Sequence, residues 1–425
     1  MTILLLAGSW LALVLIGMPI GVSMILVSVG YFHLTGSGLS FAVRLMTDGL
    51  NSFPLLAVPL FILTASLLNS SGISRRIFHF AGTLVGHVRG GLGHVNVLAS
   101  LFFSGMSGSA MADSGGLGKM EIEAMREAGY DDDFSGAVTS ASSMIGPLVP
   151  PSIPMVLYGV IANTSIGDMF LGGIVPGFLT AAALMVMVYV YAARRRYPVD
   201  RRATAREIAV AFRNSVGALL TPVVIIGGIF SGFFSPTEAA AITVLYAILL
   251  NIVLYHELTV RKFLEDLYDT AVTSASIGTI VAGVGLFGYI LAREQAPQQI
   301  AQFFLGLTSD PTMFLFIVSV LMFVLGAFVE SLAILLILVP MLVPVATGFG
   351  IDSVHFGVVV VLNLMISILT PPMGISLFIV AKVGNIPVQK LARAIVPWLV
   401  PPLAVLVLII LFPPLVTGLP ALFHH

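Results

Sequence analysis

The sequence contains no cysteine and few charged residues. Of its 425 residues, 9% are Asp, Glu, Lys or Arg and 58% are hydrophobic. The absence of cysteine excludes disulfide bonds, thiolate metal sites and a cysteine nucleophile. Because soluble domains carry about 25% charged residues, the low charge content indicates an integral membrane protein with no separate soluble domain. The chain also lacks a P-loop, a dinucleotide fingerprint and an H-E-x-x-H sequence, so we do not expect ATP to drive it directly.

Ten apolar stretches are candidate membrane spans, since a helix needs about 20 apolar residues to cross the hydrocarbon core. They cover residues 3–17, 19–34, 53–71, 133–163, 167–193, 214–231, 237–256, 271–292, 354–383 and 391–418. The first two are short and adjacent, and we favour two spans there over one bent helix. Four mixed stretches are predicted to be interfacial or inter-domain amphipathic helices, at residues 38–50, 72–90, 258–270 and 294–308.

Two further apolar regions, residues 92–127 and 312–347, are each interrupted near the middle by small and polar residues. Their limbs of about 15 residues reach only about 22 Å at 1.5 Å per residue, which is too short to cross a bilayer comfortably. We therefore predict two re-entrant helical hairpins whose tips stop near the bilayer centre. Irregular backbone at that depth is tolerated only inside protein or beside a cavity.

The sequence contains an internal repeat. Residues 101–178 align without a gap with residues 322–399, at a constant offset of 221. The matches include Gly105/Gly326, Met120/Met341, Gly129/Gly350, Asp131/Asp352, Met144/Met365, Pro150/Pro371 and Pro151/Pro372. We predict two repeats, residues 1–193 and 214–425, each with five spans and one hairpin, joined by a linker at residues 194–213. The odd number of spans inverts the second repeat. An all-α polytopic protein with an inverted repeat and interrupted helices is typical of secondary transporters.

The positive charges lie almost entirely on one side of this predicted topology. With the N-terminus outside, only Arg44 and Arg293 of the 19 Lys and Arg residues fall outside, and the other 17 fall inside. Cytoplasmic loops carry an excess of Lys and Arg. The charge distribution therefore predicts that both termini face outward and that the linker at residues 194–213 is cytoplasmic.

Both of the spans at residues 133–163 and 354–383 are interrupted by prolines near the bilayer centre. The prolines are Pro147, Pro150, Pro151 and Pro154 in the first span and Pro371 and Pro372 in the second. Each proline lacks an N–H group and ends the helix. The freed carbonyls, together with Ser and Thr hydroxyls, suit Na⁺, and the free N–H groups at helix N-termini suit an anion. The alternative is a pair of proline kinks that serve only packing.

The two hairpin tips carry the polar groups that would complete such a site. The first tip is Ser107-Gly108-Ser109-Ala110, and the second contains Gly326, Glu330 and Ser331. A carboxylate deep in a membrane costs about 3 kcal/mol or more, so it is usually functional or paired. Glu330 is therefore either a cation or substrate ligand or the N-cap of a helix, and the two roles can coexist. Asp113 has the same two alternatives.

One catalytic alternative remains. Gly105-Met-Ser107-Gly108 has the Gly-x-Ser-Gly form found around the serine of rhomboid-type intramembrane proteases. A nucleophilic serine needs a nearby base. The eight histidines all fall near predicted span ends or in interfacial stretches, and a protease would leave the repeat unexplained. A rhomboid-like intramembrane serine protease therefore remains as a remote alternative interpretation.

Four segments of the chain resemble the large membrane subunit of the tripartite ATP-independent periplasmic (TRAP) transporters. They are Ser-Gly-Ser-Ala-Met-Ala-Asp at 107–113, Gly-Pro-Leu-Val-Pro-Pro-Ser at 146–152, Gly-Ile-Asp-Ser-Val-His-Phe-Gly at 350–357 and Leu-Thr-Pro-Pro-Met-Gly at 369–374. The resemblance covers essentially the whole chain. It implies an elevator-type, Na⁺-coupled transporter in the bacterial inner membrane. The implied partners are a small four-helix membrane subunit and a periplasmic binding protein that delivers a carboxylate, such as a C4-dicarboxylate or sialic acid.

The resemblance also assigns site residues. It implies two Na⁺ sites: the first would use Ser107, Ser109, Ser143, Gly146 and Pro150, and the second would use Gly326, Thr370 and Met373. The substrate would bind between the tips, near Ser109, Ser152 and Glu330. Glu330 stands where family members often carry Asp. The main alternative to this function is a stand-alone Na⁺/dicarboxylate carrier that needs no binding protein.

Overall fold

The protein is almost entirely helical. The computed structural model describes residues 2–69 and 72–423, and every regular element in them is a helix. The first half of the chain forms α1 (Thr2–Leu15), α2 (Ile20–Leu34), α3 (Leu39–Leu50), α4 (Ala57–Asn69), α5 (Ile73–Val85), α6 (Gly91–Ser107), α7 (Ala110–Gly116), α8 (Gly118–Glu127), α9 (Asp132–Ser143), α10 (Ile153–Ala162) and α11 (Ile166–Arg195). The predicted all-α fold is confirmed.

The second half repeats this order of elements. It forms α12 (Ala205–Phe230), α13 (Pro236–Leu249), α14 (Val260–Arg293), α15 (Ala296–Leu307), α16 (Pro311–Gly326), α17 (Ser331–Gly348), α18 (Ser353–Ser367), α19 (Ile375–Val383), α20 (Val388–Ile395), α21 (Val400–Leu411) and α22 (Pro414–Phe423). At the offset of 221, the first residue of α9, Asp132, aligns with the first residue of α18, Ser353. The first residue of α3, Leu39, aligns with the first residue of α14, Val260.

The number of helices that are long enough to span a membrane on their own is smaller than the ten spans predicted from the sequence. Among the described residues, six helices have the required length and apolarity, or up to eight if each of two bent pairs counts as one span. Two predicted spans fall short because breaks at residues 144–152 and 368–374 divide each into two short helices. The first two stretches form separate helices, α1 and α2, of 14 and 15 residues.

One pair of predicted elements is a single helix. The interfacial helix expected at residues 258–270 and the span expected at residues 271–292 are joined in α14, which runs for 34 residues. No proline interrupts this stretch. The equivalent stretch of the first half contains Pro54 in a short 3-10 helix between α3 and α4, and the chain bends there by 60°. Because proline cannot continue the hydrogen-bond ladder, it accounts for the difference between the halves.

The linker between the halves is shorter than predicted and is fastened to the protein. Helix α12 begins within the predicted linker, where Thr204 and Glu207 form a capping box. At the other end, Arg195 donates hydrogen bonds to Asp131 and Asp133 at 2.9–3.0 Å. The hydroxyl of Tyr197 donates to Asp131 at 2.7 Å. Burial raises the pKa of Tyr197, as does this hydrogen bond, so the hydroxyl remains a donor at neutral pH.

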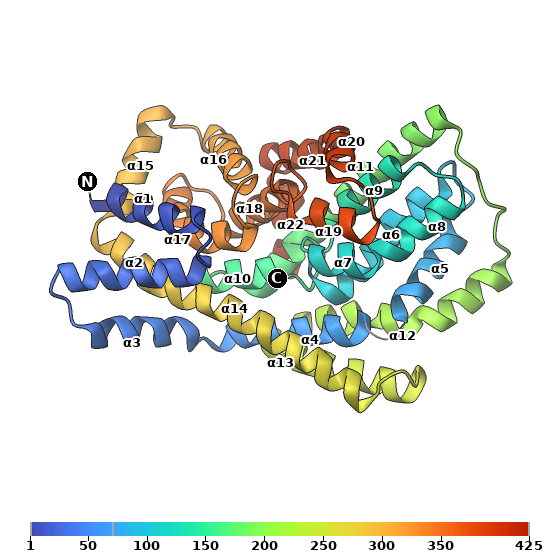
Figure 1. The fold of residues 1–425 in the computed structure, drawn as a ribbon, viewed down its shortest axis with the longest axis horizontal. Coiled ribbons are helices and arrows are strands. Elements are labelled where there is room, and N and C mark those ends of the chain that lie inside the picture. Colours follow the sequence, from blue (N-terminus) through green and yellow to red (C-terminus); the bar gives the residue numbers. More distant parts are fainter. Residues whose placement is uncertain (1, 70–71, 424–425) are drawn as a thin grey trace.

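Most of the helices form two groups, and Figure 1 shows the long, inclined α14 running beside α2 and α3 of the first group. Helix α14 packs against α2, α3 and α4, while α13 packs against α4 and α12 against α5. We call α1–α4 and α12–α14 the scaffold. The second group contains α6–α11 and α16–α21. Within it, elements of different halves interlock: α10 packs against α17 and α18, and α19 packs against α7 and α9. Within a bilayer such packing is held by van der Waals contact and hydrogen bonds rather than by the hydrophobic effect.

Candidate functional site

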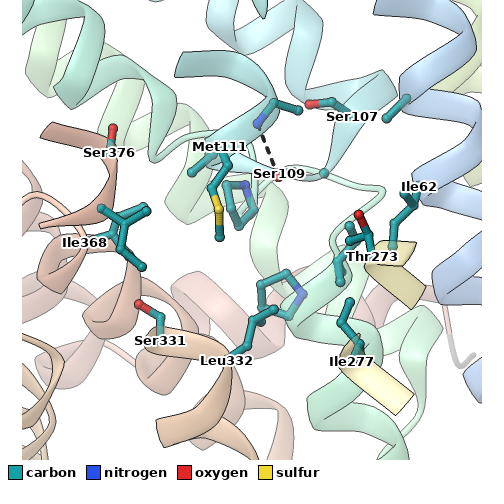
Figure 2. A pocket seen from close by; sticks show the side chains of 18 of the residues that line it. Ile62, Ser107, Ser109, Met111, Thr273, Ile277, Ser331, Leu332, Ile368 and Ser376 are labelled. Atoms are coloured by element: carbon teal, nitrogen blue, oxygen red, sulfur yellow. Dashed lines mark hydrogen bonds between the residues drawn. The ribbon is translucent and has the colours of Figure 1, made fainter. Parts of the chain in front are cut away.

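A cavity of about 370 Å³ lies between the two groups of helices. On one side it is lined by the tips of two interrupted helical regions: hairpin 1 (α6, α7 and α8, tip at residues 107–109) and hairpin 2 (α16 and α17, tip at residues 327–330). On the other side it is lined by α4 and α14 of the scaffold. Figure 2 shows Ser109 and Met111 of hairpin 1, Ser331 of hairpin 2, and Ile62 and Thr273 of the scaffold around this space.

The tip of hairpin 1 is held against the first proline break, residues 144–152, which we call break 1. Gly108 has a left-handed backbone with φ of +59°, and a Cβ atom there would lie 2.3 Å from the carbonyl oxygen of Pro151. Only glycine fits such a position. At Gly146, a Cβ atom would lie 3.3 Å from the carbonyl carbon of Ser109. Two glycines therefore allow the backbone of tip 1 to lie directly on break 1.

The tip of hairpin 2 meets break 2, residues 368–374, in a similar way. A Cβ atom at Gly326 would lie 2.2 Å from the hydroxyl oxygen of Ser367, at the end of α18. The backbone N–H of Met373 donates to the carbonyl of Ala327 at 3.2 Å. The hydroxyl of Ser331 donates to the carbonyl of Leu364 at 3.4 Å. Each hairpin tip is thus joined to the break of its own half.

The residues predicted for the first cation site come together at tip 1 and break 1. Ser107 is fully buried, and its hydroxyl has no hydrogen-bond partner in the part of the chain that the structure describes. Ser109 caps α7 by accepting the N–H of Ala112 at 3.3 Å. Ser143 is also fully buried and donates to the carbonyl of Ser140 at 2.8 Å. Gly146 and Pro150 lie in break 1 itself, where both are buried. The side chains available here are neutral hydroxyls, and the rest of the set is backbone.

Sequence reasoning missed one residue of this region, Ser376. Its hydroxyl lies 3.1 Å from the Ser143 hydroxyl and 2.8 Å from the Ser114 hydroxyl. Ser376 belongs to α19 of the second half, so it connects the two halves beside the first predicted cation site. The repeat pairs Ser376 with Met155, which gave no signal for this contact.

The residues predicted for the second cation site lie at tip 2 and break 2. Thr370 is buried, and its hydroxyl donates to the carbonyl of Ile366 at 3.0 Å, which leaves its oxygen lone pairs available. Gly326 contacts break 2 as described above. The side chain of Met373 is 57% exposed, so this residue could contribute to a site here through its backbone. Both Pro-Pro bonds, Pro150-Pro151 and Pro371-Pro372, are cis.

Of the three residues predicted to bind substrate, two line the cavity. They are Ser109 and Glu330. The carboxylate of Glu330 also caps α17, accepting the N–H groups of Leu332 and Ala333 at 3.1 and 3.0 Å, so the capping interpretation of Glu330 is confirmed. Ser152 is not among the lining residues. Its hydroxyl donates to the carbonyl of Pro147 and accepts the N–H of Met155, so it stabilises break 1 and caps α10.

The cavity combines positive helix ends with an absence of basic side chains. Helices α10, α17 and α19 all begin at the cavity wall, where Ile153, Ser331 and Ile375 lie. A helix N-terminus carries a partial positive charge and favours anions. The described lining residues include the acidic Glu330 and Asp269 but no Lys, Arg or His. An anion bound here would therefore depend on helix ends, hydroxyls and any cations held at the tips.

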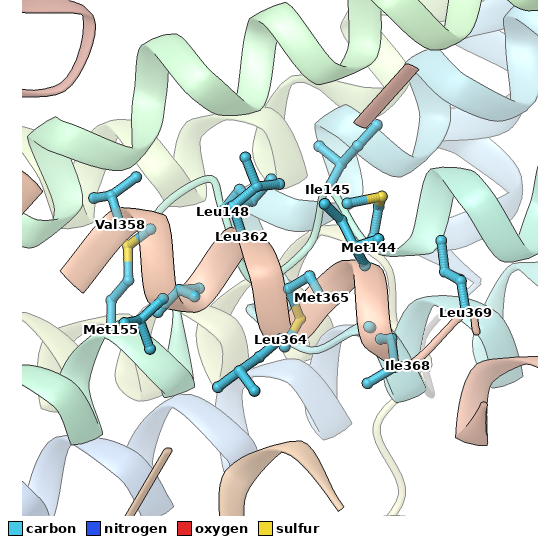
Figure 3. Packing of buried hydrophobic residues seen from close by; sticks show 14 of the residues in the cluster. Met144, Ile145, Leu148, Met155, Val358, Leu362, Leu364, Met365, Ile368 and Leu369 are labelled. Carbon is cyan, nitrogen blue, oxygen red and sulfur yellow. The ribbon is translucent and has the colours of Figure 1, made fainter. Parts of the chain in front are cut away.

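The two breaks are supported by a core to which both halves contribute. Figure 3 shows Met144, Leu148 and Met155 from the first half distributed along α18 of the second half, which carries Leu362 and Met365. All five are at most 4% exposed. This contiguous packing fixes the two breaks relative to each other, and with them the helix ends that face the cavity.

Comparison with known proteins agrees with this architecture. Residues 7–415 match the family model "Tripartite ATP-independent periplasmic transporter, DctM component". The chain belongs to this family of membrane transport proteins. The family membership confirms the resemblance stated above and removes the protease alternative, because the relatives are permeases.

Three relatives show the range of the family. The chain is 54% identical to the sialic acid TRAP transporter large permease protein SiaM of Vibrio cholerae, with 97% of both chains covered. It is 46% identical to the sialic acid permease protein SiaT of Haemophilus influenzae, covering 97% of this chain and 67% of SiaT. It is 36% identical to the C4-dicarboxylate large permease protein DctM of Pseudomonas aeruginosa, with 90% and 89% covered. The crystal structure of the Alcanivorax borkumensis YdaH transporter shares the fold, with a TM-score of 0.65, 13% identity and 88% of both chains covered.

Proposed function

We propose that this chain is the large permease subunit of a Na⁺-coupled secondary transporter that imports an organic acid. The observation that carries the proposal is the cavity between the two hairpin tips. It faces the N-termini of α10, α17 and α19, and hydroxyls and backbone carbonyls suited to Na⁺ lie at the tips beside it. Oxygen-only ligand sets favour hard cations, and positive helix ends favour a carboxylate. A small membrane subunit and a periplasmic binding protein complete the transporter.

The proposed mechanism follows from the contacts between the hairpin tips and the breaks, and from the packing of the two halves against each other. Na⁺ ions bound at the tips would fix each tip on its break and supply the positive charge that the cavity wall lacks. The carboxylate of the substrate then binds beside them. The hairpins and broken helices, which interlock across the two halves, move together past the scaffold in an elevator-type step. Each net positive charge carried inward gains about 2.3 kcal/mol per 100 mV of membrane potential.

We further propose that the acid is singly charged and rich in hydroxyl groups, as sialic acid is. The cavity wall offers hydrogen-bond acceptors at Glu330 and Asp269, and amide and hydroxyl groups at Asn69 and Ser66. These groups suit a polyhydroxylated molecule. A C4-dicarboxylate would bring two negative charges to a wall that already holds two carboxylates and no basic residue. The higher identity to the two sialic acid permeases than to the dicarboxylate permease supports the same choice.

Uptake assays in proteoliposomes test the proposal. The chain is reconstituted with the small subunit and the binding protein, and uptake of radiolabelled sialic acid and of succinate is measured. We expect sialic acid uptake that requires an inward Na⁺ gradient and that stops when the binding protein is omitted. Equal uptake driven by a proton gradient in Na⁺-free buffer would refute the coupling. Uptake that continues without the binding protein would favour the stand-alone carrier.

A further inference from the structure

A second pair of carboxylates lies inside hairpin 1, away from the cavity. Asp113 of α7 is 2% exposed and Glu121 of α8 is 1% exposed, and neither lines the cavity. The two lie on consecutive short helices that pack against each other, α7 and α8. Among the ion pairs of the described residues, none involves either carboxylate. Two buried like charges without a basic partner need a compensating positive charge.

The polar side chains around the pair form a hydrogen-bond network that reaches Glu121 at one oxygen, Oε2, and leaves Oε1 without a partner. The amide of Asn96 donates to Glu121 Oε2 at 2.8 Å and to the Thr139 hydroxyl at 2.7 Å. The Ser142 hydroxyl donates to Asn96 Oδ1 at 2.7 Å. The hydroxyl of Ser100, which lies beside Asp113, donates to Ser142 Oγ at 3.0 Å.

Among the described residues, three carboxylate oxygens have no hydrogen-bond partner, although the Ser100 hydroxyl lies close enough to Asp113 to turn toward it. They are both Oδ atoms of Asp113 and Oε1 of Glu121, and all three are buried. A single proton shared by the pair would form one O–H···O bond, which would satisfy only two of these oxygens. All three oxygens can coordinate one hard monovalent cation, together with hydroxyl oxygens such as that of Ser100. The count of unpaired oxygens therefore favours a metal cation over a single shared proton.

We propose that Asp113 and Glu121 bind a Na⁺ ion inside hairpin 1, in addition to the two sites proposed at the tips. This inference rests on the proposed Na⁺ coupling. The site lies on the same short helix as the tip, because the N–H of Asp113 donates to the carbonyl of Ser109 at 3.1 Å. Binding at Asp113 therefore holds the first turn of α7, which Ser109 caps at the cavity wall. Occupancy of the internal site and order of tip 1 are coupled.

The test is Na⁺ binding to the purified full-length chain together with its small subunit. Equilibrium binding of ²²Na⁺ gives the number of ions per chain, and thermal unfolding is measured in Na⁺ and in choline at equal ionic strength. The variants Asp113→Asn and Glu121→Gln keep the side-chain shape and remove one charge each. Glu123→Gln is the matched control, since Glu123 is an exposed carboxylate on the same helix, α8, paired with Lys119.

We expect the wild type and Glu123→Gln to bind three ions and each of the two site variants to bind one fewer. In choline, the site variants should be at least as stable as the wild type, because an uncompensated buried charge has been removed. In Na⁺, the wild type should gain more stability than they do.

Other results overturn the inference. A wild-type count of two overturns it whether or not the variants fold. An unchanged ion count in folded Asp113→Asn and Glu121→Gln also overturns it, and a simultaneous loss of pH-dependent stability would point to a shared proton. If the wild type binds no Na⁺ at all, the proposed Na⁺ coupling fails as well, which separates the two failures.

Discussion

Replacing Gly326 by Ala should separate hairpin 2 from break 2. A Cβ atom at this position would lie 2.2 Å from Ser367 Oγ and 2.4 Å from Ser367 Cβ. Rotation of the serine side chain can relieve the contact with the oxygen. It cannot relieve the contact with Cβ, because that atom is fixed to the backbone of α18. Helices α16 and α18 must therefore move apart at the point where the second cation site is proposed.

The expected cost has two parts. Inserting a methyl group into a packed interior costs about 1–3 kcal/mol of stability. If the displaced tip no longer supplies a ligand to Na⁺, the loss of one such interaction costs about 1–3 kcal/mol more, roughly a 5- to 150-fold loss of affinity. Thermal unfolding of the purified protein measures the first part. Na⁺ titration of substrate uptake in proteoliposomes measures the second.

Gly348→Ala provides the control on the same hairpin. This glycine ends α17, and apart from its chain neighbours and its own helix no described atom lies within 4 Å of the position that a Cβ atom would take. The control should therefore unfold at the wild-type temperature or slightly above it, with unchanged Na⁺ dependence. If Gly326→Ala matched Gly348→Ala in both measurements, the contact between tip 2 and break 2 would be unimportant, and the reasoning for the second cation site would fail.

Three further predictions concern the second cation site, the topology and the linker. Thr370→Val should raise the Na⁺ concentration for half-maximal uptake by roughly 5- to 150-fold, because it removes one hydroxyl. Val149→Thr, at the matching position of the first half, should leave this concentration unchanged. Equal effects of the two substitutions would contradict a hydroxyl ligand at Thr370. In intact spheroplasts, an impermeant maleimide should label Ala421→Cys and leave Thr204→Cys unlabelled, and the reverse pattern would invert the predicted topology. Arg195→Ala removes hydrogen bonds to two partly exposed aspartates. Thermal unfolding should therefore show a loss of stability of about 0.2–1 kcal/mol per ion pair, and this loss should be smaller in high salt. A loss of stability that does not depend on salt would mean that packing contributes more than the ion pairs.

Much of the architecture could be predicted because proline and glycine act locally. The helix break at Pro150-Pro151 follows from missing N–H groups, whatever surrounds it. The same holds for Pro371-Pro372, and the structure places non-helical backbone at both. The left-handed residue Gly108 in the first tip belongs to the same class of signal.

The continuity of α14 could not be predicted from the composition of residues 258–292. Its first turns carry charged residues and its later turns are apolar, which is the usual pattern of an interfacial helix followed by a span. Whether two such stretches join is decided by the backbone between them. Pro54 bends the equivalent stretch of the first half, and α14 has no such residue.

Contacts between distant residues were also beyond the reach of the sequence. Ser376 meets Ser143 and Ser114 only because α19 of the second half packs on α7 and α9 of the first. Asp113 and Glu121 are eight residues apart, and the sequence suggested a helix start or a ligand for the first of them. Their burial and their unpaired oxygens depend on how α6, α7, α8 and α9 pack together.

The matching residues of the two hairpin tips both cap a helix, although their side chains differ in chemistry. Ser109 and Glu330 occupy matching positions, and each caps the helix that follows its tip. Capping requires only an oxygen acceptor at that position, which either a hydroxyl or a carboxylate provides. The inverted repeat can therefore place a neutral group on one side of the cavity and an acidic group on the other without changing the fold. A substrate with a carboxylate at one end and hydroxyls at the other would bind such a cavity in one orientation, with its carboxylate toward the Ser109 tip and its hydroxyls toward Glu330.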